Sequence, residues 1–400
     1  MSEPPHGRLA VEVDDADGRY HRQQLISWWD QDRLANARIL VVGAGALGNE
    51  LLKNLALLGV GNVVVIDLDT VENSNLSRCV LFREADEGRP KAHVVADAAR
   101  GLNPDITITP VVGDVRTALG LQVFAGMDVV LGGLDNREAR LHVNGCCWKT
   151  STPWVDGAIE GLMGMMRVFS PPGSACYECT MNERDQELLA ARRACSLLTR
   201  DQMLEGKVPT TATSASIIAA MQVQEAVKLL HRDRIDAPFG GKGVAYNGLT
   251  HDSYVVTYPR REDCLSHDTY DLDDATPVAA GTSFGELLDD GSARLGPGTV
   301  LDLEREIVTH LSCAACATEE AVFRQIEALT QGAALCDVCG EERRLTLVHS
   351  ITTDDGPLLA MTAAEFGLPP FDVVTARRDM DRHHFLVGAD AFALEQLPGA

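Results

Sequence analysis

Residues 37–59 read ARILVVGAGALGNELLKNLALLG, and this stretch decides the fold. It opens with an unbroken apolar run, Ile39–Val42, of the kind found in strands that are buried on both faces of a parallel sheet. Glycines follow at Gly43, Gly45 and Gly48. The next leucines fall on one face of a helix that we expect to end at Gly59: Leu51, Leu52, Leu55 and Leu58. A strand, a glycine-rich loop and a helix in this order indicate a nucleotide-binding α/β unit.

The flanking sequence extends this pattern. Strands are predicted at 62–69, 106–115 and 127–135, and helices at 20–36 and 214–230, followed by strand-like segments VAYN and SYVVTYP. Strands that alternate with helices predict an α/β fold with a doubly wound, mainly parallel sheet. We expect a poorly ordered tail at 1–18, a first domain at 19–270 and a linker at 268–281. A separable α+β module should then occupy 281–400.

The charge of the chain excludes some classes of function. Its 58 acidic and 35 basic residues give a net charge of −23. Residues 271–400 hold 23 of the acids and 8 of the bases, a net −15. An acidic surface disfavours nucleic-acid binding, which needs basic groups against phosphates. With no apolar run of 18 residues and no signal-peptide profile, we expect a cytoplasmic protein without a membrane partner.

The glycine loop by itself does not decide the reaction. Asp67 lies 19 residues beyond Gly48, where an acidic side chain can bond a ribose hydroxyl, and a dehydrogenase would fit equally well. Polar residues then gather in DLDTVENSNLSR (67–78) and in GRPK (88–91). Arg78 or Lys91 alone could lie on a solvated helix face. Together, such residues are what a nucleotidyl-transfer site needs to hold a triphosphate and release pyrophosphate.

These motifs resemble those of the ubiquitin-activating enzyme superfamily, which includes bacterial activators of sulfur-carrier proteins. Residues 67–78 match its D-x-D-x-V-x-x-S-N-L-x-R-Q motif, except that Cys79 replaces the final Gln. RYHRQ (19–23) is similar to its R-Y-x-R-Q motif, and GGLDN (132–136) to its strand end with an aspartate. ELLKNLA (50–56) and DGAIEG (156–161) are similar to the subunits that activate ubiquitin-like modifiers. The resemblance covers roughly residues 19–267.

The resemblance implies a Rossmann-like adenylation domain that uses ATP and Mg²⁺. It implies that Asp67 and Asp69 belong to the nucleotide site, with Asp67 on the ribose. The phosphates would be held by Asn75, Arg78 and Lys91, and Asp135 would be associated with the magnesium ion. Arg22 would reach the ATP of the opposite subunit, so we expect a homodimer in which Arg22 acts in trans.

A cysteine between the first domain's two halves is the candidate nucleophile. Cys195 follows Arg192 and Arg193, whose charges favour the thiolate. In the resembled family the catalytic cysteine occupies this crossover, about 180–213, and captures the adenylated modifier as a thioester. The alternative is an inert cysteine at a helix end. Cys146 and Cys147 lie in a helix-like stretch that we expect to face the core.

Eight residues form two candidate zinc sites, which also indicates a reducing compartment. By the resemblance, the first combines Cys176 and Cys179 with Cys264 and His267, although His267 could be a simple linker residue. The second has the spacing of a zinc ribbon and is read directly from the sequence: Cys313, Cys316, Cys336 and Cys339. We expect two structural Zn²⁺ ions per chain.

The acidic module is similar only loosely to the ubiquitin-fold domain that recruits a conjugating enzyme. Residues 362–368 are predicted as a short helix that leads into a strand at 371–374. The net −15 would suit a basic partner surface, or would simply aid solubility. His383 and His384 are expected to be a surface polar pair.

The predicted function is ATP-dependent adenylation of the carboxyl terminus of a ubiquitin-like protein, its capture on Cys195 and its transfer to a conjugating enzyme. The alternative enzyme is a sulfur-carrier adenylyltransferase without an obligatory thioester. The long acidic module argues against that alternative. A third class, a binding module without activity, is disfavoured by the complete set of polar residues at the nucleotide site.

Overall fold

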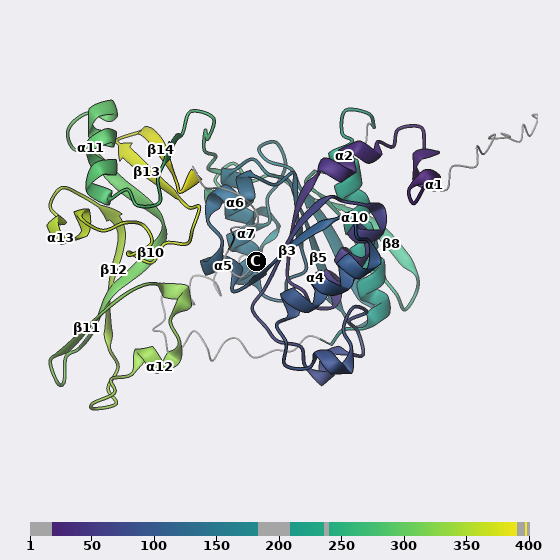
Figure 1. Ribbon diagram of the computed structural model, residues 1–400, viewed down its shortest axis with the longest axis horizontal. Helices are drawn as coiled ribbons and strands as arrows, with labels where there is room; N and C mark the ends of the chain where they lie inside the picture. The colour runs from purple at the N-terminus through teal and green to yellow at the C-terminus, as the bar shows by residue number, and fades with distance from the viewer. Residues whose placement is uncertain (1–17, 183–208, 236–239, 390–396, 398–400) are drawn as a thin grey trace, which may run out of the picture.

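The computed structural model describes residues 18–182, 209–235, 240–389 and 397 of the 400-residue chain. The described residues form two β-sheets, one in the purple-to-teal part of Figure 1 and one in its green-to-yellow part. No described helix has the length and apolar character needed to cross a membrane. Residues 1–17 and the predicted nucleophile Cys195 lie outside the described residues.

The larger sheet has eight strands in the order β3-β2-β1-β4-β5-β6-β7-β8. The first five in this order pair in parallel and the last three pair antiparallel. The strands are β1 (Arg38–Val42), β2 (Asn62–Asp67), β3 (Thr107–Val112), β4 (Val129–Gly132), β5 (Trp154–Glu160), β6 (Met163–Phe169), β7 (Lys242–Asn247) and β8 (Asp252–Thr257). This confirms the predicted α/β fold with a mainly parallel sheet.

Helices cover both faces of this sheet because its central strands are apolar on both sides. Ile39 and Val41 of β1 lie in one hydrophobic core, and Leu40 and Val42 lie in the other. The helices are α1 (His21–Gln24), α2 (Gln31–Asn36), α3 (Ala46–Leu58), α4 (Lys91–Leu102), α5 (Val115–Ala118), α6 (Leu121–Ala125), α7 (Arg137–Lys149) and α10 (Ala212–Leu230). Figure 1 shows α4 and α10 on one side of the strands and α5, α6 and α7 on the other. Cys146 and Cys147 are buried in the second core, as predicted.

The second sheet has the order β11-β10-β13-β14-β9, and β12 also pairs with β10. Its first strand, β9, runs parallel to its last, β14, and α11 packs on β10, β13 and β14. Short 3₁₀ turns complete the described chain. The elements of this part are β9 (Thr276–Val278), α11 (Phe284–Leu295), β10 (Val300–Cys313), β11 (Thr318–Gln325), α12 (Gln331–Ala334), β12 (Arg344–Ile351), α13 (Gly356–Leu359), β13 (Val373–Arg378) and β14 (Asp381–Val387).

A buried ion pair of the second module, Arg305–Asp372, contacts the backbone of the first domain near α6. Arg305 of β10 donates from Nε to Asp372 Oδ2 at 3.1 Å and from a guanidinium nitrogen to the Leu119 carbonyl at 2.6 Å. The other oxygen of Asp372 accepts the Leu121 N–H, at the start of α6. Gln122 Nε2 donates to the carbonyls of Asp372 and Val387 at 2.9 Å. The second sheet is therefore docked on the first domain through buried hydrogen bonds.

The structure corrects four local predictions. The helix at 20–36 is interrupted between α1 and α2, where Asp30 adopts an extended conformation and caps α2. The linker at 268–281 contains β9, which pairs with β14. Residues 363–367 form turns and not the predicted helix, and Gly367 at their end has a φ of 91°.

The fourth correction concerns the histidine pair in β14. His384 is 6% exposed, stacks on Tyr270 with ring centroids 4.3 Å apart, and shares a hydrogen bond of 3.0 Å with Thr375 Oγ1. Burial lowers the pKa of His384 to about 4. The pair was predicted to be surface polar, but only His383 retains partial exposure.

Candidate active site

The predicted nucleotide residues gather where the carboxyl ends of β1, β2 and β4 meet. The chain leaves β1 toward β2 on one side, while β4 pairs on the other side. Such a point, at which the strand order reverses, is where α/β sheets bind ligands. The glycine loop follows β1, Asp67 ends β2, and Asp135 lies three residues beyond β4.

The three glycines of the loop, Gly43, Gly45 and Gly48, have different structural roles. Gly43 has a φ of 97°, and a Cβ there would lie 2.6 Å from the Gly133 carbonyl oxygen. A Cβ on Gly48 would lie 1.9 Å from the Gly43 carbonyl oxygen. These two glycines permit close backbone packing. At Gly45, the N-cap of α3, a Cβ would meet no heavy atom of the described residues within 4 Å. The space above this helix N-terminus is open, and backbone N–H groups there favour phosphate.

Asp67 ties the glycine loop to the end of β2. Its Oδ2 accepts the Ala44 N–H at 2.6 Å, and its Oδ1 accepts the Asp69 N–H at 2.8 Å. Burial raises the pKa of Asp67, although these two hydrogen bonds oppose the shift. Each carboxylate oxygen can accept more than one hydrogen bond, so both retain capacity for a ligand hydroxyl.

Asp69 and Lys91 form an ion pair beside Asp67. Lys91 Nζ lies 2.7 Å from Asp69 Oδ2, and the Lys91 backbone N–H donates to the Asp69 carbonyl at 2.9 Å. Burial would lower the pKa of Lys91. The hydrogen bond to Asp69 and the charges of Asp67 and Asp69 outweigh burial and raise it. The structure thus keeps a charged ammonium group at the edge of the glycine loop, where a phosphate chain would need it.

Asn75 and Arg78 shape the turn that follows β2. Asn75 is buried, and its side-chain oxygen accepts the Glu72 N–H at 3.0 Å. Arg78 donates to the Ser74 carbonyl at 2.7 Å and stays partly exposed. Cys79, which replaces the Gln of the motif, is buried, and desolvation raises its pKa to about 11. Its thiol is therefore a core group of this turn and not an activated nucleophile.

Asp135 is exposed beyond the end of β4. Asn136 Nδ2 donates to Asp135 Oδ1 at 3.2 Å, while Asn136 Oδ1 caps α7 by accepting the Ala139 N–H at 2.8 Å. The cap fixes the backbone at the start of α7 and leaves most of the Asp135 carboxylate free for a cation.

Two buried polar groups that support this edge were not predicted. Asn49 Nδ2 donates to the carbonyls of Ala44 and Gly45 at 2.8 and 3.0 Å, and its oxygen accepts the Leu81 N–H at 2.9 Å. It joins the glycine loop to the segment after the Asp67 motif. The sequence signal for this role of Asn49 is an amide side chain on the otherwise apolar face of the helix.

The second such group is Asp156 of β5, which has no exposed surface. Its carboxylate accepts Arg140 Nε at 2.9 Å and also pairs with Arg167. Arg140 donates further to the Gly157 carbonyl at 3.1 Å. This fully paired network stiffens the sheet between β5, β6 and α7 beneath the Asp135 loop.

Arg22 lies away from the glycine loop of its own chain. It follows Tyr20, whose hydroxyl accepts Asn103 Nδ2 at 2.6 Å and which covers Gly59, beyond the carboxyl end of α3. The glycine loop is at the other end of α3, a 13-residue helix about 20 Å long at 1.5 Å per residue. Arg22 is exposed and has no hydrogen bond or ion pair within the described part of the chain.

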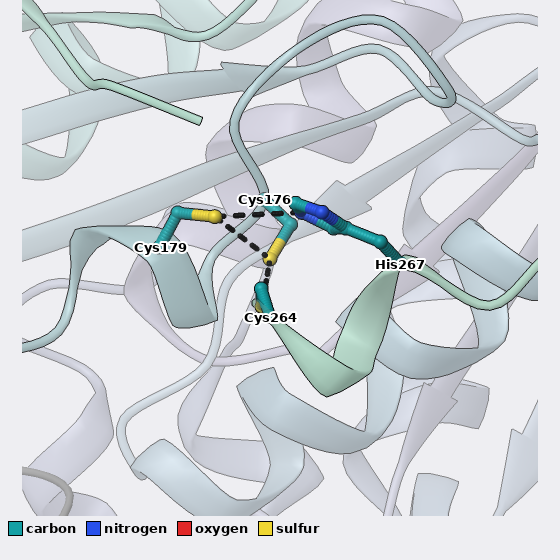
Figure 2. A group of neighbouring side chains, drawn as sticks. All are labelled: Cys176, Cys179, Cys264 and His267. Carbon is teal, nitrogen blue, oxygen red and sulfur yellow. Dashed lines mark hydrogen bonds between the residues drawn. The ribbon is translucent and has the colours of Figure 1, made fainter. Parts of the chain in front are cut away.

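The structure brings together the four residues of the first candidate zinc site (Figure 2): Cys176, Cys179, Cys264 and His267. Their ligand atoms all lie within 4.8 Å of one another, although the two halves are 88 residues apart. The sulfur of Cys176 lies 3.7 Å from that of Cys179 and 3.6 Å from that of Cys264. Sulfurs on one tetrahedral zinc, at about 2.3 Å each, would lie about 3.8 Å apart. The donor set therefore fits Zn²⁺, and Trp148 stacks on the His267 ring at 4.8 Å.

The second candidate zinc site lies at the far end of β10. Cys313 ends this strand, and its sulfur lies 3.4 Å from that of Cys339. Cys316 lies 3.4 Å from Cys336 and 3.8 Å from Cys339, sulfur to sulfur. Four thiols at this spacing also fit a tetrahedral zinc with no open position. Cys339 is exposed, whereas the cysteines of the first site are all buried.

Comparisons with known proteins agree with this geometry. The SAMP-activating enzyme E1 of Haloferax volcanii is 35% identical over 240 residues, covering 58% of this chain and 81% of that enzyme. The molybdopterin-synthase adenylyltransferase of Escherichia coli is 33% identical over 236 residues, covering 58% of this chain and 88% of that enzyme. The structure of Escherichia coli MccB with ATP shares the fold, with a TM-score of 0.52, 22% identity, and coverage of 64% of this chain and 75% of MccB. The ThiF family model matches residues 19–266. The chain therefore belongs to the ThiF family of the ubiquitin-activating enzyme superfamily.

Proposed function

We propose that this chain is an adenylyltransferase that uses ATP to activate the carboxyl terminus of a small ubiquitin-like or sulfur-carrier protein. The observation that carries the proposal is the Lys91–Asp69 ion pair, with a buried lysine and an exposed aspartate, beside the N-terminus of α3 in a ThiF-family sheet. A cation beside the backbone N–H groups of a helix N-terminus would hold a triphosphate. Relatives whose names describe modifier activation and adenylyl transfer support the same chemistry.

The proposed reaction makes an acyl adenylate. A carboxylate oxygen of the carrier protein attacks the α-phosphorus of ATP, and the bond to pyrophosphate breaks. Lys91 and Arg78 would offset the negative charge that develops on the phosphates. Asp67 would hold the ribose, as the resemblance implies. Asp135 would hold Mg²⁺, which when bound neutralises phosphate charge.

We further propose that Arg22 serves the nucleotide site of a second copy in a homodimer. Its location beyond the carboxyl end of α3 supports this, because the glycine loop of its own chain lies at the amino end. An arginine supplied in trans would add positive charge to the leaving pyrophosphate only when the dimer is assembled.

The finer proposal is that Cys195 captures the adenylated carrier. Its thiolate would attack the carbonyl carbon, AMP would leave, and a thioester would pass the carrier to a conjugating enzyme. The match to a SAMP-activating enzyme E1 supports the activation step with which this route begins. The second candidate function is transfer of the adenylate to a sulfur donor, and the match to the molybdopterin-synthase adenylyltransferase favours it.

We also propose that both cysteine clusters hold structural Zn²⁺. The ligands would be Cys176, Cys179, Cys264 and His267 in one site, and Cys313, Cys316, Cys336 and Cys339 in the other. Each site would offer four protein ligands, so bound zinc would crosslink the fold without providing an open catalytic position.

The thioester route and the sulfur-carrier route can be distinguished by whether the carrier protein becomes covalently attached to the enzyme. Wild-type protein, Cys195→Ala and Cys146→Ala are incubated with ATP, Mg²⁺ and ubiquitin-like proteins encoded in the same genome. Cys146 is the matched control, because burial raises its pKa to about 12. We expect Cys195→Ala to retain pyrophosphate exchange and lose the reductant-sensitive adduct, while Cys146→Ala keeps both. An adduct that persists in Cys195→Ala would rule out the assignment, and exchange without an adduct in the wild type would favour the sulfur-carrier route.

A further inference from the structure

A buried histidine holds the segment that carries Arg22. His231 caps the carboxyl end of α10 and has no exposed surface. Its Nε2 accepts the Asp30 N–H at 3.0 Å, and its Nδ1–H donates to the Val227 carbonyl at 2.8 Å. Both ring nitrogens are therefore satisfied in a single tautomer. One of them fixes the backbone of a residue 201 positions away.

Two tryptophans complete this contact. The rings of Trp28 and Trp29 lie 5.4 and 5.8 Å from the His231 ring, between ring centroids. Trp29 Nε1 donates to Gln31 Oε1 at 3.0 Å, and Gln31 Nε2 donates to the Leu58 carbonyl at 2.9 Å. The segment is thus joined to the ends of both α10 and α3.

Ion pairs surround the histidine but are more exposed. Arg234 donates to Asp30 Oδ2 at 2.7 Å, and Arg33 donates to the Leu230 carbonyl at 2.8 Å and pairs with Asp233. Exposed pairs of this kind contribute little, because water and salt screen them. The buried imidazole of His231 therefore makes the directional hydrogen bond that holds the Asp30 backbone.

Tyr20 provides a second fixed point, through Asn103 and the close approach to Gly59. Between Tyr20 and Trp28 the chain forms α1, which presents Arg22 to solvent. Leu25 and Ile26, also in this stretch, are 48% and 40% exposed. A short segment fixed at both ends therefore displays one unpaired cation and two apolar side chains.

We propose that His231 is a positioning residue for the adenylation reaction: it fixes the segment 20–30 so that Arg22 enters the nucleotide site of a second copy. This inference rests on the proposed function of Arg22. The rigid segment offsets the flexibility of the arginine side chain, whose correct placement is needed for catalysis. A misplacement of about 1 Å can cost about 100-fold in rate.

The test uses mixed dimers, purified through a different tag on each chain. One chain carries Arg22→Ala and keeps an intact nucleotide site. The other carries Lys91→Ala and supplies Arg22. His231→Phe keeps an aromatic ring but removes the acceptor for the Asp30 N–H, and His231→Gln restores an acceptor. His349→Phe, at an exposed histidine on β12, is the matched control.

We expect the mixed dimer to recover pyrophosphate exchange. Adding His231→Phe to the Lys91→Ala chain should lower kcat at least about tenfold, with a smaller change in KM for ATP. The same substitution in the Arg22→Ala chain should have no effect, and His231→Gln should restore part of the rate. His349→Phe should be neutral in either chain. A purely structural role would affect both chains alike.

The outcomes separate this inference from the function on which it rests. If no doubly tagged dimer forms, or if the mixed dimer shows no exchange, the trans role of Arg22 is wrong and the inference falls with it. If exchange is restored but His231→Phe has no effect, or the same effect in both chains, the role of His231 is wrong while the function of Arg22 stands.

Discussion

The charged side chains at the carboxyl edge of the larger sheet differ in exposure from those at the boundary between the two sheets. At the carboxyl edge of the larger sheet, Asp69 and Asp135 are exposed to solvent. In the second sheet, Arg305 and Asp372 are 8% and 0% exposed and satisfy each other and the backbone of the first sheet. The paired charges at the boundary dock the acidic module on the first domain.

The largest expected effect is the local unfolding that follows removal of zinc. It compares how far each sheet depends on its cysteine cluster. The cluster around Cys336 adjoins a core with only four buried residues among those described, whereas the cluster around Cys176 lies within the second core of the larger sheet. Structural zinc contributes about 10–16 kcal/mol of apparent binding free energy in small domains. We expect a chelator with reductant to unfold β11 and the end of β10 and leave β1–β5 folded.

Hydrogen exchange read by mass spectrometry checks this difference, and metal analysis should find about two zinc per chain before chelation. Cys336→Ser is the matched variant for the ribbon and Cys176→Ser for the first cluster. Equal loss of protection in both sheets would show that the two clusters do not differ as their cores suggest.

The next effect concerns the docking pair. Asp372→Ala leaves Arg305 buried without its partner, which should lower the free energy of unfolding by about 3–5 kcal/mol. Arg294→Gln on α11 is the control, because its pair with Asp290 is exposed and should contribute less than about 0.5 kcal/mol. Thermal or denaturant unfolding gives both values.

The double variant Asp372→Ala with Arg305→Met sharpens the result, since it removes both charges. We expect it to recover part of the lost stability. If Asp372→Ala is no more destabilising than Arg294→Gln, the two sheets are not joined by this pair.

The smallest effect concerns Cys79 beneath the nucleotide site. Burial raises its pKa to about 11, so at pH 8 its thiolate fraction should be about 200-fold below that of a free cysteine. A raised folded-state pKa contributes stability that is present below about pH 8.5 and is lost as pH rises toward 11. We expect slow alkylation of native protein at pH 8, and exchange within about twofold of wild type for Cys79→Ser. Rapid alkylation of Cys79 would contradict its buried placement.

Local patterns predicted the parts of the fold that depend on neighbouring residues. The β1–α3 unit was predicted with its end at Gly59, where the observed φ is 75°. The zinc-site prediction paired Cys176 with Cys264 across 88 residues, but only through the family resemblance. The sequence prediction placed Asp67, Asp69 and Lys91 in one site through the family resemblance, and the structure places Lys91 Nζ 2.7 Å from Asp69 Oδ2.

Most of the errors come from contacts between distant residues. The burial of His384 against Tyr270 has no local sequence signal. The break between α1 and α2 has one, because Asp30 is a favoured N-cap residue, although its contact with His231 is distant. The docking of the second sheet depends on Arg305, an ordinary residue of a strand until its partner Asp372 is placed opposite. Asn49 was overlooked because a single amide in an apolar helix does not reveal which carbonyls it meets.

The central claim is that the edge formed by Lys91, Asp69 and the glycine loop adenylates a carrier protein. The most direct measurement is exchange of labelled pyrophosphate into ATP, with and without candidate ubiquitin-like proteins and with carriers whose carboxyl terminus is amidated. We predict exchange that requires a free carboxyl terminus and falls about 100- to 1,000-fold in Lys91→Ala, but stays within about twofold in Lys53→Ala. Pyrophosphate exchange that does not require the carrier protein, or that is unchanged in Lys91→Ala, would contradict the account.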